Sequence, residues 1–175
     1  MTPTTIAPRL DFEALAPHAN RALAHLDHAV TKELDAVDFD ARLRELVRIR
    51  ASQLNGCAYC VDMHTKDARA VGETEPRLHA LAVWREAPFF TDRERAALEW
   101  TEAVTRVGDT HVPDDVFERV RDHFTEAELV ALTFAIVVIN SWNRLAVSFR
   151  VPAGTYQPHP ERAQRVEGSQ PAVHA

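Results

Sequence analysis

The sequence is short of glycine, of strand-like segments and of cysteine. Five glycines occur in 175 residues, and alternation of β-branched and polar residues is nearly absent, so the pattern does not favour a sheet. Two cysteines are present, and both belong to a single Cys-x-x-Cys unit, Cys57 and Cys60. The fold is therefore expected to be helical, and any thiol chemistry must reside in that one unit.

Three further features are missing. Acidic and basic residues are interleaved, with a net charge of −6, and no basic stripe points to nucleic acid as a partner. Residues 1–9 have neither a basic leader nor the apolar segment of a signal peptide. The longest apolar stretch, 129–139, is interrupted by Thr133 and is too short to span a membrane. We therefore expect a cytoplasmic protein without a membrane partner, where a Cys-x-x-Cys unit is typical of catalysis or metal binding.

The composition is that of one soluble globular domain. Apolar residues make up 46% and charged residues 26% of the chain, and the length is enough to bury a hydrophobic core. The two ends are rich in proline, threonine, glutamine and glycine and show little periodicity. The sequence predicts a flexible N-terminus at residues 1–10, a single helical domain at 11–152 and a C-terminal tail at 153–175.

Helical periodicity and capping signals occur along most of the domain. Residues Thr91 and Thr125 each begin a capping box with a glutamate three residues later, and Asp40 is a suitable N-cap. The apolar stretch 129–139 is expected to lie inside the core. These signals predict helices over about 17–33, 41–54, 58–71, 91–105 and 125–149, with a short helix near Pro113.

Both cysteines lie at the start of the predicted helix over 58–71. On a helix, Cys57, Cys60 and His64 occupy positions i, i+3 and i+7 and project from one face. Gly56 ends the preceding helix, so the thiols lie in a first turn, where unpaired N–H groups and the helix dipole favour a thiolate. A thiolate is the nucleophile that attacks a peroxide or a disulfide, and His64 can take the thiol proton or stabilise the thiolate.

Helix geometry also places Glu45 near His64. If the two helices form an antiparallel hairpin about residues 55–56, Glu45 lies within about one turn of the imidazole. A carboxylate there can orient the ring and raise its basicity. The sequence alone favours a solvated Glu45 that pairs with Arg48 or Arg42.

The dithiol has other interpretations. A zinc site is the main rival, although structural zinc uses four ligands and the chain offers two thiolates and His64 without a second Cys-x-x-Cys. Attachment of haem requires histidine directly after the second cysteine, and position 61 is valine. Two inert buried thiols are also possible, but they would not need this spacing.

At this point the sequence resembles a known family. Glu45, the segment 55–60 (NGCAYC) and His64 resemble the Glu…Cys-x-x-Cys-x-x-x-His signature of the alkylhydroperoxidase-D-like members of the carboxymuconolactone decarboxylase family. Segments 90–98 (FTDRERAAL) and 140–147 (NSWNRLAV) are also similar to the longer members. The resemblance covers about residues 12–155 and implies an all-α, alkylhydroperoxidase-D-like helical bundle with the Cys-x-x-Cys unit at the start of a central helix.

The resemblance also implies roles for these residues. Cys60 would be the peroxidatic thiol that becomes a sulfenic acid, and Cys57 would resolve it to a Cys57–Cys60 disulfide. Glu45 and His64 would form a proton relay. An external dithiol, of thioredoxin or lipoyl type, would reduce the disulfide without a cofactor. The helix-dipole argument alone favours Cys57 as the nucleophile, whereas the register of His64 with Cys60 favours the family assignment.

The resemblance further implies a homo-oligomer, with a trimer or hexamer favoured over a dimer. One departure concerns Tyr59, because the peroxidase members carry a histidine between the cysteines. Decarboxylase members lack the Cys-x-x-Cys unit, so the cysteines argue against lactone decarboxylation. The leading hypothesis is a thiol-dependent peroxidase acting on a hydroperoxide. The alternatives are a thiol–disulfide oxidoreductase without a peroxide substrate and a non-enzymatic structural or zinc-binding oligomeric module.

Overall fold

The protein is all-α over residues 6–158, the part of the chain that the computed structural model describes. No strand occurs in this range, which confirms the predicted fold class. Most of the predicted tail lies outside the described residues. The elements are α1 (Phe12–Leu15), α2 (Pro17–Ala36), α3 (Ala41–Leu54), α4 (Ala58–Ala70), α5 (Glu75–Ala80), the 3₁₀-helix η1 (Leu81–Val83), α6 (Asp92–Thr105), α7 (Val107–Thr110), α8 (Asp114–Arg121) and α9 (Glu126–Phe149).

Local capping explains where the main helices begin. Asp40 accepts a hydrogen bond from the Leu43 N–H at 2.8 Å at the start of α3, which satisfies one of the unpaired donors of that turn. Thr91 and Thr125 form complete capping boxes before α6 and α9, as predicted. The sequence did not predict the short elements α1, α5, η1 and α7, although Asp11 caps α1 by accepting the Ala14 N–H at 3.0 Å.

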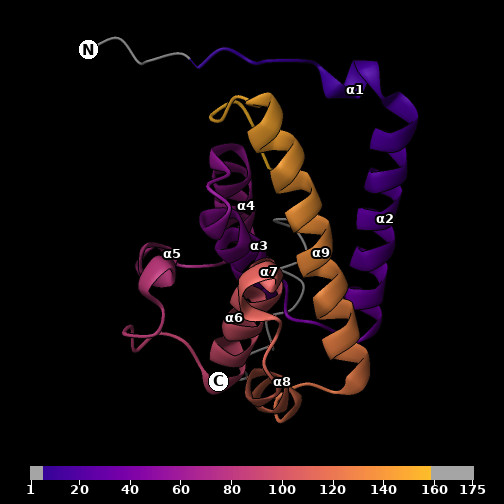
Figure 1. Cartoon of the computed structure of the whole chain (residues 1–175). Helices are drawn as coiled ribbons and strands as arrows, with labels where there is room; N and C mark the ends of the chain where they lie inside the picture. The colour runs from indigo at the N-terminus through magenta and orange to yellow at the C-terminus, as the bar shows by residue number, and fades with distance from the viewer. Residues whose placement is uncertain (1–5, 159–175) are drawn as a thin grey trace, which may run out of the picture.

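The helices α3, α4 and α9 form the centre of the molecule. Helix α3 packs against α4, α6 and α9, and α2 runs beside α9 on the other side (Figure 1). The turn between α3 and α4 uses Gly56 at φ 67°, a left-handed conformation that glycine adopts without steric cost. The predicted hairpin over residues 41–71 is therefore present.

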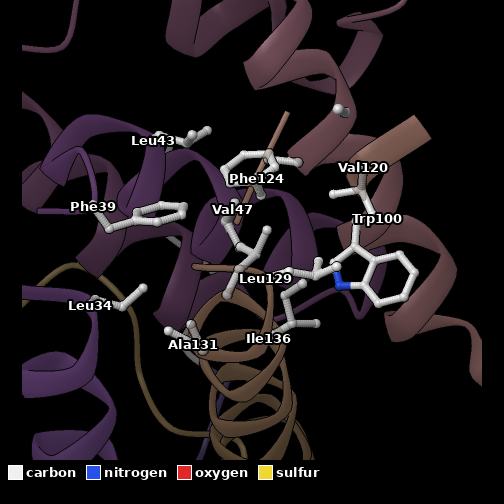
Figure 2. Packing of buried hydrophobic residues seen from close by; sticks show 14 of the residues in the cluster. Leu34, Phe39, Leu43, Val47, Trp100, Val120, Phe124, Leu129, Ala131 and Ile136 are labelled. Atoms are coloured by element: carbon white, nitrogen blue, oxygen red, sulfur yellow. The ribbon is translucent and has the colours of Figure 1, made fainter. Parts of the chain in front are cut away.

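The largest apolar cluster fills the space between α2, α3, α6, α8 and the first half of α9. Figure 2 shows its side chains converging from these helices. Phe39 and Phe124 stack with their ring centroids 5.8 Å apart, and Trp100 donates its indole N–H to Thr133 at 3.0 Å. The labelled members in Figure 2 are Leu34, Phe39, Leu43, Val47, Trp100, Val120, Phe124, Leu129, Ala131 and Ile136.

Helix α9 differs in one respect from the prediction. The expectation that residues 129–139 lie inside the core holds for one face only, because Val130, Phe134 and Val137 are 56%, 50% and 45% exposed. These three positions follow helical spacing and form an apolar stripe on the outer face. By length and composition α9 could cross a membrane, but half of its apolar window is buried, as expected of the core helix of a soluble protein.

Candidate active site around the Cys57–Cys60 dithiol

The dithiol lies at the N-terminus of α4, as the sequence predicts. Cys57 is the N-cap residue, and its sulfur accepts the Cys60 N–H at 3.3 Å. The two cysteines form a disulfide with their Cα atoms 5.4 Å apart. Both residues are 2% exposed. One N–H of the first turn, that of Cys60, therefore points at the Cys57 sulfur, and the N-terminus of a helix stabilises a thiolate when the disulfide is reduced.

His64 of α4 and Glu45 of α3 are in contact. The His64 Nδ1 lies 2.8 Å from Glu45 Oε2, and both side chains are buried. An ionised carboxylate only accepts hydrogen bonds, so Nδ1 carries the proton and Nε2 is left as the basic nitrogen of the ring. The structure therefore joins His64 to Glu45 and Cys57 to Cys60, and Cys60 and His64 line one cavity.

A second ion pair connects Glu45 to α2, and the sequence did not reveal its full extent. Arg48 donates to Glu45 Oε1 at 3.1 Å and to Asp27 Oδ1 at 3.3 Å. The Trp142 indole N–H donates to the other oxygen of Asp27 at 3.1 Å. Arg48 therefore pairs with Glu45 without removing it from His64. The alternative of a solvated Glu45 is wrong, because the Glu45 side chain is 1% exposed.

Cys60 and His64 line the same cavity, of about 270 Å³. Its polar side is formed by His64, Arg48 and Asp27, and its apolar side includes Met63 and Trp142. An apolar wall with a few converging polar groups is typical of a small-molecule site. A substrate in this cavity meets the Cys60 sulfur and the basic imidazole together.

Tyr59, which replaces the family's histidine between the cysteines, borders this cavity. Burial, followed by the carboxylates of Glu13, Asp62 and Asp67, raises the pKa of the Tyr59 phenol above its usual range. The phenol therefore stays neutral at physiological pH. Unlike an imidazolium, it places no positive charge beside the sulfurs.

A buried polar network holds the turn before Cys57 against α9. The Asn55 side-chain amide donates to the side-chain oxygens of Asn140 and Asn143, each at 2.9 Å. Asn143 in turn donates to the Ser52 hydroxyl at 3.0 Å. The Ser52 carbonyl accepts the Cys57 N–H at 2.9 Å. These bonds fix the position of the dithiol relative to α9, which supplies Trp142 to the cavity.

One group of side chains has the chemistry of a cation site. Ligand atoms of Glu45, His64 and Asp67 lie within 4.8 Å of one another, and all three residues are buried. However, the Glu45 oxygens already bond to His64 and Arg48, and Asp67 accepts the Tyr156 hydroxyl at 2.8 Å. A cation would have to displace these bonds, so the donor set fits a proton relay better than a metal.

Comparison with known proteins agrees with this geometry. Residues 17–103 match the carboxymuconolactone decarboxylase family. An uncharacterized protein of Bacillus subtilis strain 168, YdfG, is 39% identical over 143 residues, which are 82% of this chain and 95% of that protein.

Two solved structures are also similar. A protein of unknown function from Agrobacterium tumefaciens, suggested to be the antioxidant defence protein AhpD, has a TM-score of 0.80 and 41% identity, covering 86% of this chain and all of that one (100%). The debrominase Bmp8 has a TM-score of 0.64 at 18% identity, covering 85% and 76% of the two chains, and this likeness concerns the fold alone. The chain belongs to the carboxymuconolactone decarboxylase family and has the fold of its alkylhydroperoxidase-D-like members.

Proposed function

We propose that the protein is a thiol-dependent peroxidase that cycles through the Cys57–Cys60 disulfide. The observation that carries the proposal is the shared cavity of Cys60 and His64, with Glu45 bonded to His64 at 2.8 Å. A base that is oriented by a carboxylate and lies beside a thiol is the arrangement that activates a nucleophile. No metal or flavin is needed for this cycle.

The proposed cycle begins with the reduced dithiol. His64 takes the Cys60 proton, and the thiolate attacks one peroxide oxygen, so the O–O bond breaks and Cys60 becomes a sulfenic acid. The departing alkoxide takes the proton from His64 and leaves as an alcohol. The Cys57 thiol then attacks the Cys60 sulfur, which forms the disulfide and releases water. An external dithiol restores both thiols and is itself oxidised to a disulfide.

The test is peroxide consumption with dihydrolipoamide, thioredoxin or glutathione as reductant. Cys60→Ser should abolish consumption, whereas Cys57→Ser should react once and leave Cys60 as a sulfenic acid that a selective probe labels. The proposal fails if Cys57→Ser is the variant that resists oxidation while Cys60→Ser accumulates the sulfenic acid.

A thiol–disulfide oxidoreductase remains the second candidate, because the same disulfide and the neutral Tyr59 also suit exchange without peroxide. In that case a disulfide substrate, and no hydroperoxide, would oxidise the reduced protein. A bromopyrrole is a useful further substrate in the panel, because a debrominase shares the fold.

We also propose that the protein is a cytoplasmic homo-oligomer and that the outer stripe of α9 faces a second copy. The stripe consists of Val130, Phe134 and Val137, which are about half exposed. Apolar side chains gathered on one helix face favour association. Sedimentation at micromolar concentration should show an oligomer that Phe134→Glu dissociates. A monomer in the unsubstituted protein would contradict the proposal.

A further inference from the structure

The two cysteines of the disulfide line different cavities. Cys60 lines the cavity of about 270 Å³ that contains His64. Cys57 lines a separate groove of about 490 Å³ between the start of α4 and the end of α9. Tyr59, Ala146 and Val151 border both spaces and form the partition between them. A molecule in the groove therefore meets Cys57, whereas a molecule in the cavity meets Cys60.

The two spaces also differ in charge. The Cys60 cavity is bordered by Glu13, Asp27, Arg48 and His64. Among the described residues that line the Cys57 groove, Arg150 is the only charged one. The guanidinium of Arg150 is exposed and forms no ion pair with any residue in the range 6–158. The groove thus combines aliphatic walls with one available positive charge.

Taken with the proposed function, on which this step rests, the geometry points to the Cys57 groove as the binding site of the reductant, a small dithiol with an aliphatic chain and an anionic group. The chain would pack on Val147 and Val151, and the anion would pair with Arg150. Cys57 is 2% exposed, so a slender molecule can reach its sulfur more readily than a cysteine on the surface of a folded protein.

The reduction then follows a defined order of attack. A thiolate of the reductant attacks the Cys57 sulfur from the groove, the Cys57–Cys60 bond breaks, and the electron pair leaves with Cys60. His64, in the other cavity, can donate a proton to the departing Cys60 thiolate. The second thiol of the reductant attacks its own sulfur in the mixed disulfide and releases Cys57. Two electrons and two protons pass to the protein, and the reductant becomes a cyclic disulfide.

This order explains how one dithiol can serve two reactants. The hydroperoxide would react with Cys60 on the His64 side, and the reductant would react with Cys57 on the Arg150 side. Neither reactant would have to leave before the other binds. The partition that contains Tyr59 would keep the two sites apart.

The test uses the oxidised full-length protein and two thiols of equal length, a mercaptohexanoate with a terminal thiol and its neutral alcohol analogue. The mixed disulfide is trapped by alkylation at low pH, and fragmentation mass spectrometry assigns it to Cys57 or Cys60. We expect the adduct on Cys57. We also expect the carboxylate to react faster by about two- to fivefold, the effect of one exposed charge pair.

Three variants sharpen the result. Arg150→Gln should remove the advantage of the carboxylate and leave the rate with the alcohol unchanged. Val147→Trp fills the groove and should slow both thiols by about tenfold or more, because displacement by even 1 Å disrupts attack. Val107→Trp, the same change at an exposed valine that lines neither space, should have no effect on either rate.

An adduct on Cys60, or equal rates in Val147→Trp and the unsubstituted protein, would overturn the inference. Rapid reduction by thioredoxin with no reaction of small dithiols such as dihydrolipoate would also overturn it. Oxidation of the reduced protein by peroxide is measured separately. A protein that forms the Cys57 adduct but ignores peroxide retains the groove as a reductant site and refutes the proposed peroxidase.

Discussion

Helices α3 and α9 each bury both apolar and polar side chains, and the two kinds of side chain perform different tasks. The first part of α3 contributes Leu43 and Val47 to the large apolar cluster, as the first part of α9 contributes Ile136. At later positions α3 also carries Arg48 and Ser52, and α9 carries Asn140 and Asn143, and these polar residues are all buried. Ser52, Asn140 and Asn143 belong to the hydrogen-bond network that holds the turn before Cys57.

The difference follows from the physics of the two kinds of contact. Apolar burial is favourable in any orientation, so it stabilises the fold without fixing a side chain to within a fraction of an ångström. Hydrogen bonds are directional and costly when buried and unmade. The buried polar side chains therefore position Cys57, His64 and Glu45, while the apolar side chains supply most of the stability.

The largest expected effect is on the chemistry of the buried polar side chains around the dithiol. His64→Gln removes the base beside Cys60 and should slow oxidation of the reduced protein by about 10²–10⁴-fold at neutral pH. Stopped-flow oxidation over a range of pH measures this. The deficit should shrink toward high pH, where the thiol ionises unaided.

A matched control is His28→Gln, because His28 is exposed on α2, and it should leave the rate unchanged. Parallel pH profiles for His64→Gln and the unsubstituted protein would show that His64 supports the fold rather than the thiolate.

The second expected effect is on stability and concerns the buried apolar side chains. Ile136 is fully buried, and Ile136→Ala should lower the free energy of unfolding by about 2–5 kcal/mol, from lost burial and the cavity left behind. Urea denaturation measures the loss, and Val107→Ala at an exposed site provides the control. The oxidation rate of the folded variant should not change. A slowed reaction would contradict the separate roles of the apolar and the polar side chains.

Much of the fold, and the dithiol with His64 and Glu45, could be predicted from local sequence. Capping boxes at Thr91 and Thr125 lie within one turn of the chain, so they mark helix starts without knowledge of the tertiary structure. The hairpin about residues 55–56 has fixed geometry, which is why Glu45 could be placed beside His64.

The remaining contacts join residues far apart in the chain. Trp142 and Asp27 are separated by 115 positions, and Asn55 and Asn143 by 88. No periodicity links such pairs, since each depends on how α2 and α9 pack. The exposed stripe on α9 was missed for a related reason: a continuous apolar run does not show which of its faces is covered.

The third prediction tests the polar network. Asn143 is fully buried, and Asn143→Leu leaves the Asn55 amide and the Ser52 hydroxyl each short of a partner, at a cost of about 1–3 kcal/mol. Thermal and urea unfolding measure this cost. Because the network holds the turn before Cys57, the rate of disulfide reduction should change as well.

Ser141→Ala on the same helix is the control, because the Ser141 hydroxyl bonds to Val137 of its own helix at 3.0 Å. An unfolding loss in Asn143→Leu without any change at the dithiol would mean that the network stabilises α9 but does not position Cys57.

The smallest expected effect is on the pH dependence of stability, at the ion pairs around Arg77. Burial alone would raise the pKa of Glu94, but hydrogen bonds from Arg77 and Thr91 hold the pKa below its usual range. A carboxyl group with a lowered pKa in the folded state stabilises the protein above the pKa of the unfolded state, about 4.3, and loses that contribution as the pH falls toward the folded value. Stability should therefore decline below about pH 5, and Glu94→Gln should reduce that decline by at most about 1 kcal/mol, as for other partly exposed pairs.

Urea midpoints between neutral pH and about pH 3 measure this decline, with Glu86→Gln at an exposed site as the control. Because Glu94 contacts neither the dithiol nor the apolar cluster, peroxide oxidation at neutral pH should be unchanged. A steeper loss of stability with acid in Glu94→Gln than in the unsubstituted protein would reverse the sign and contradict the assigned role of the Arg77 pair.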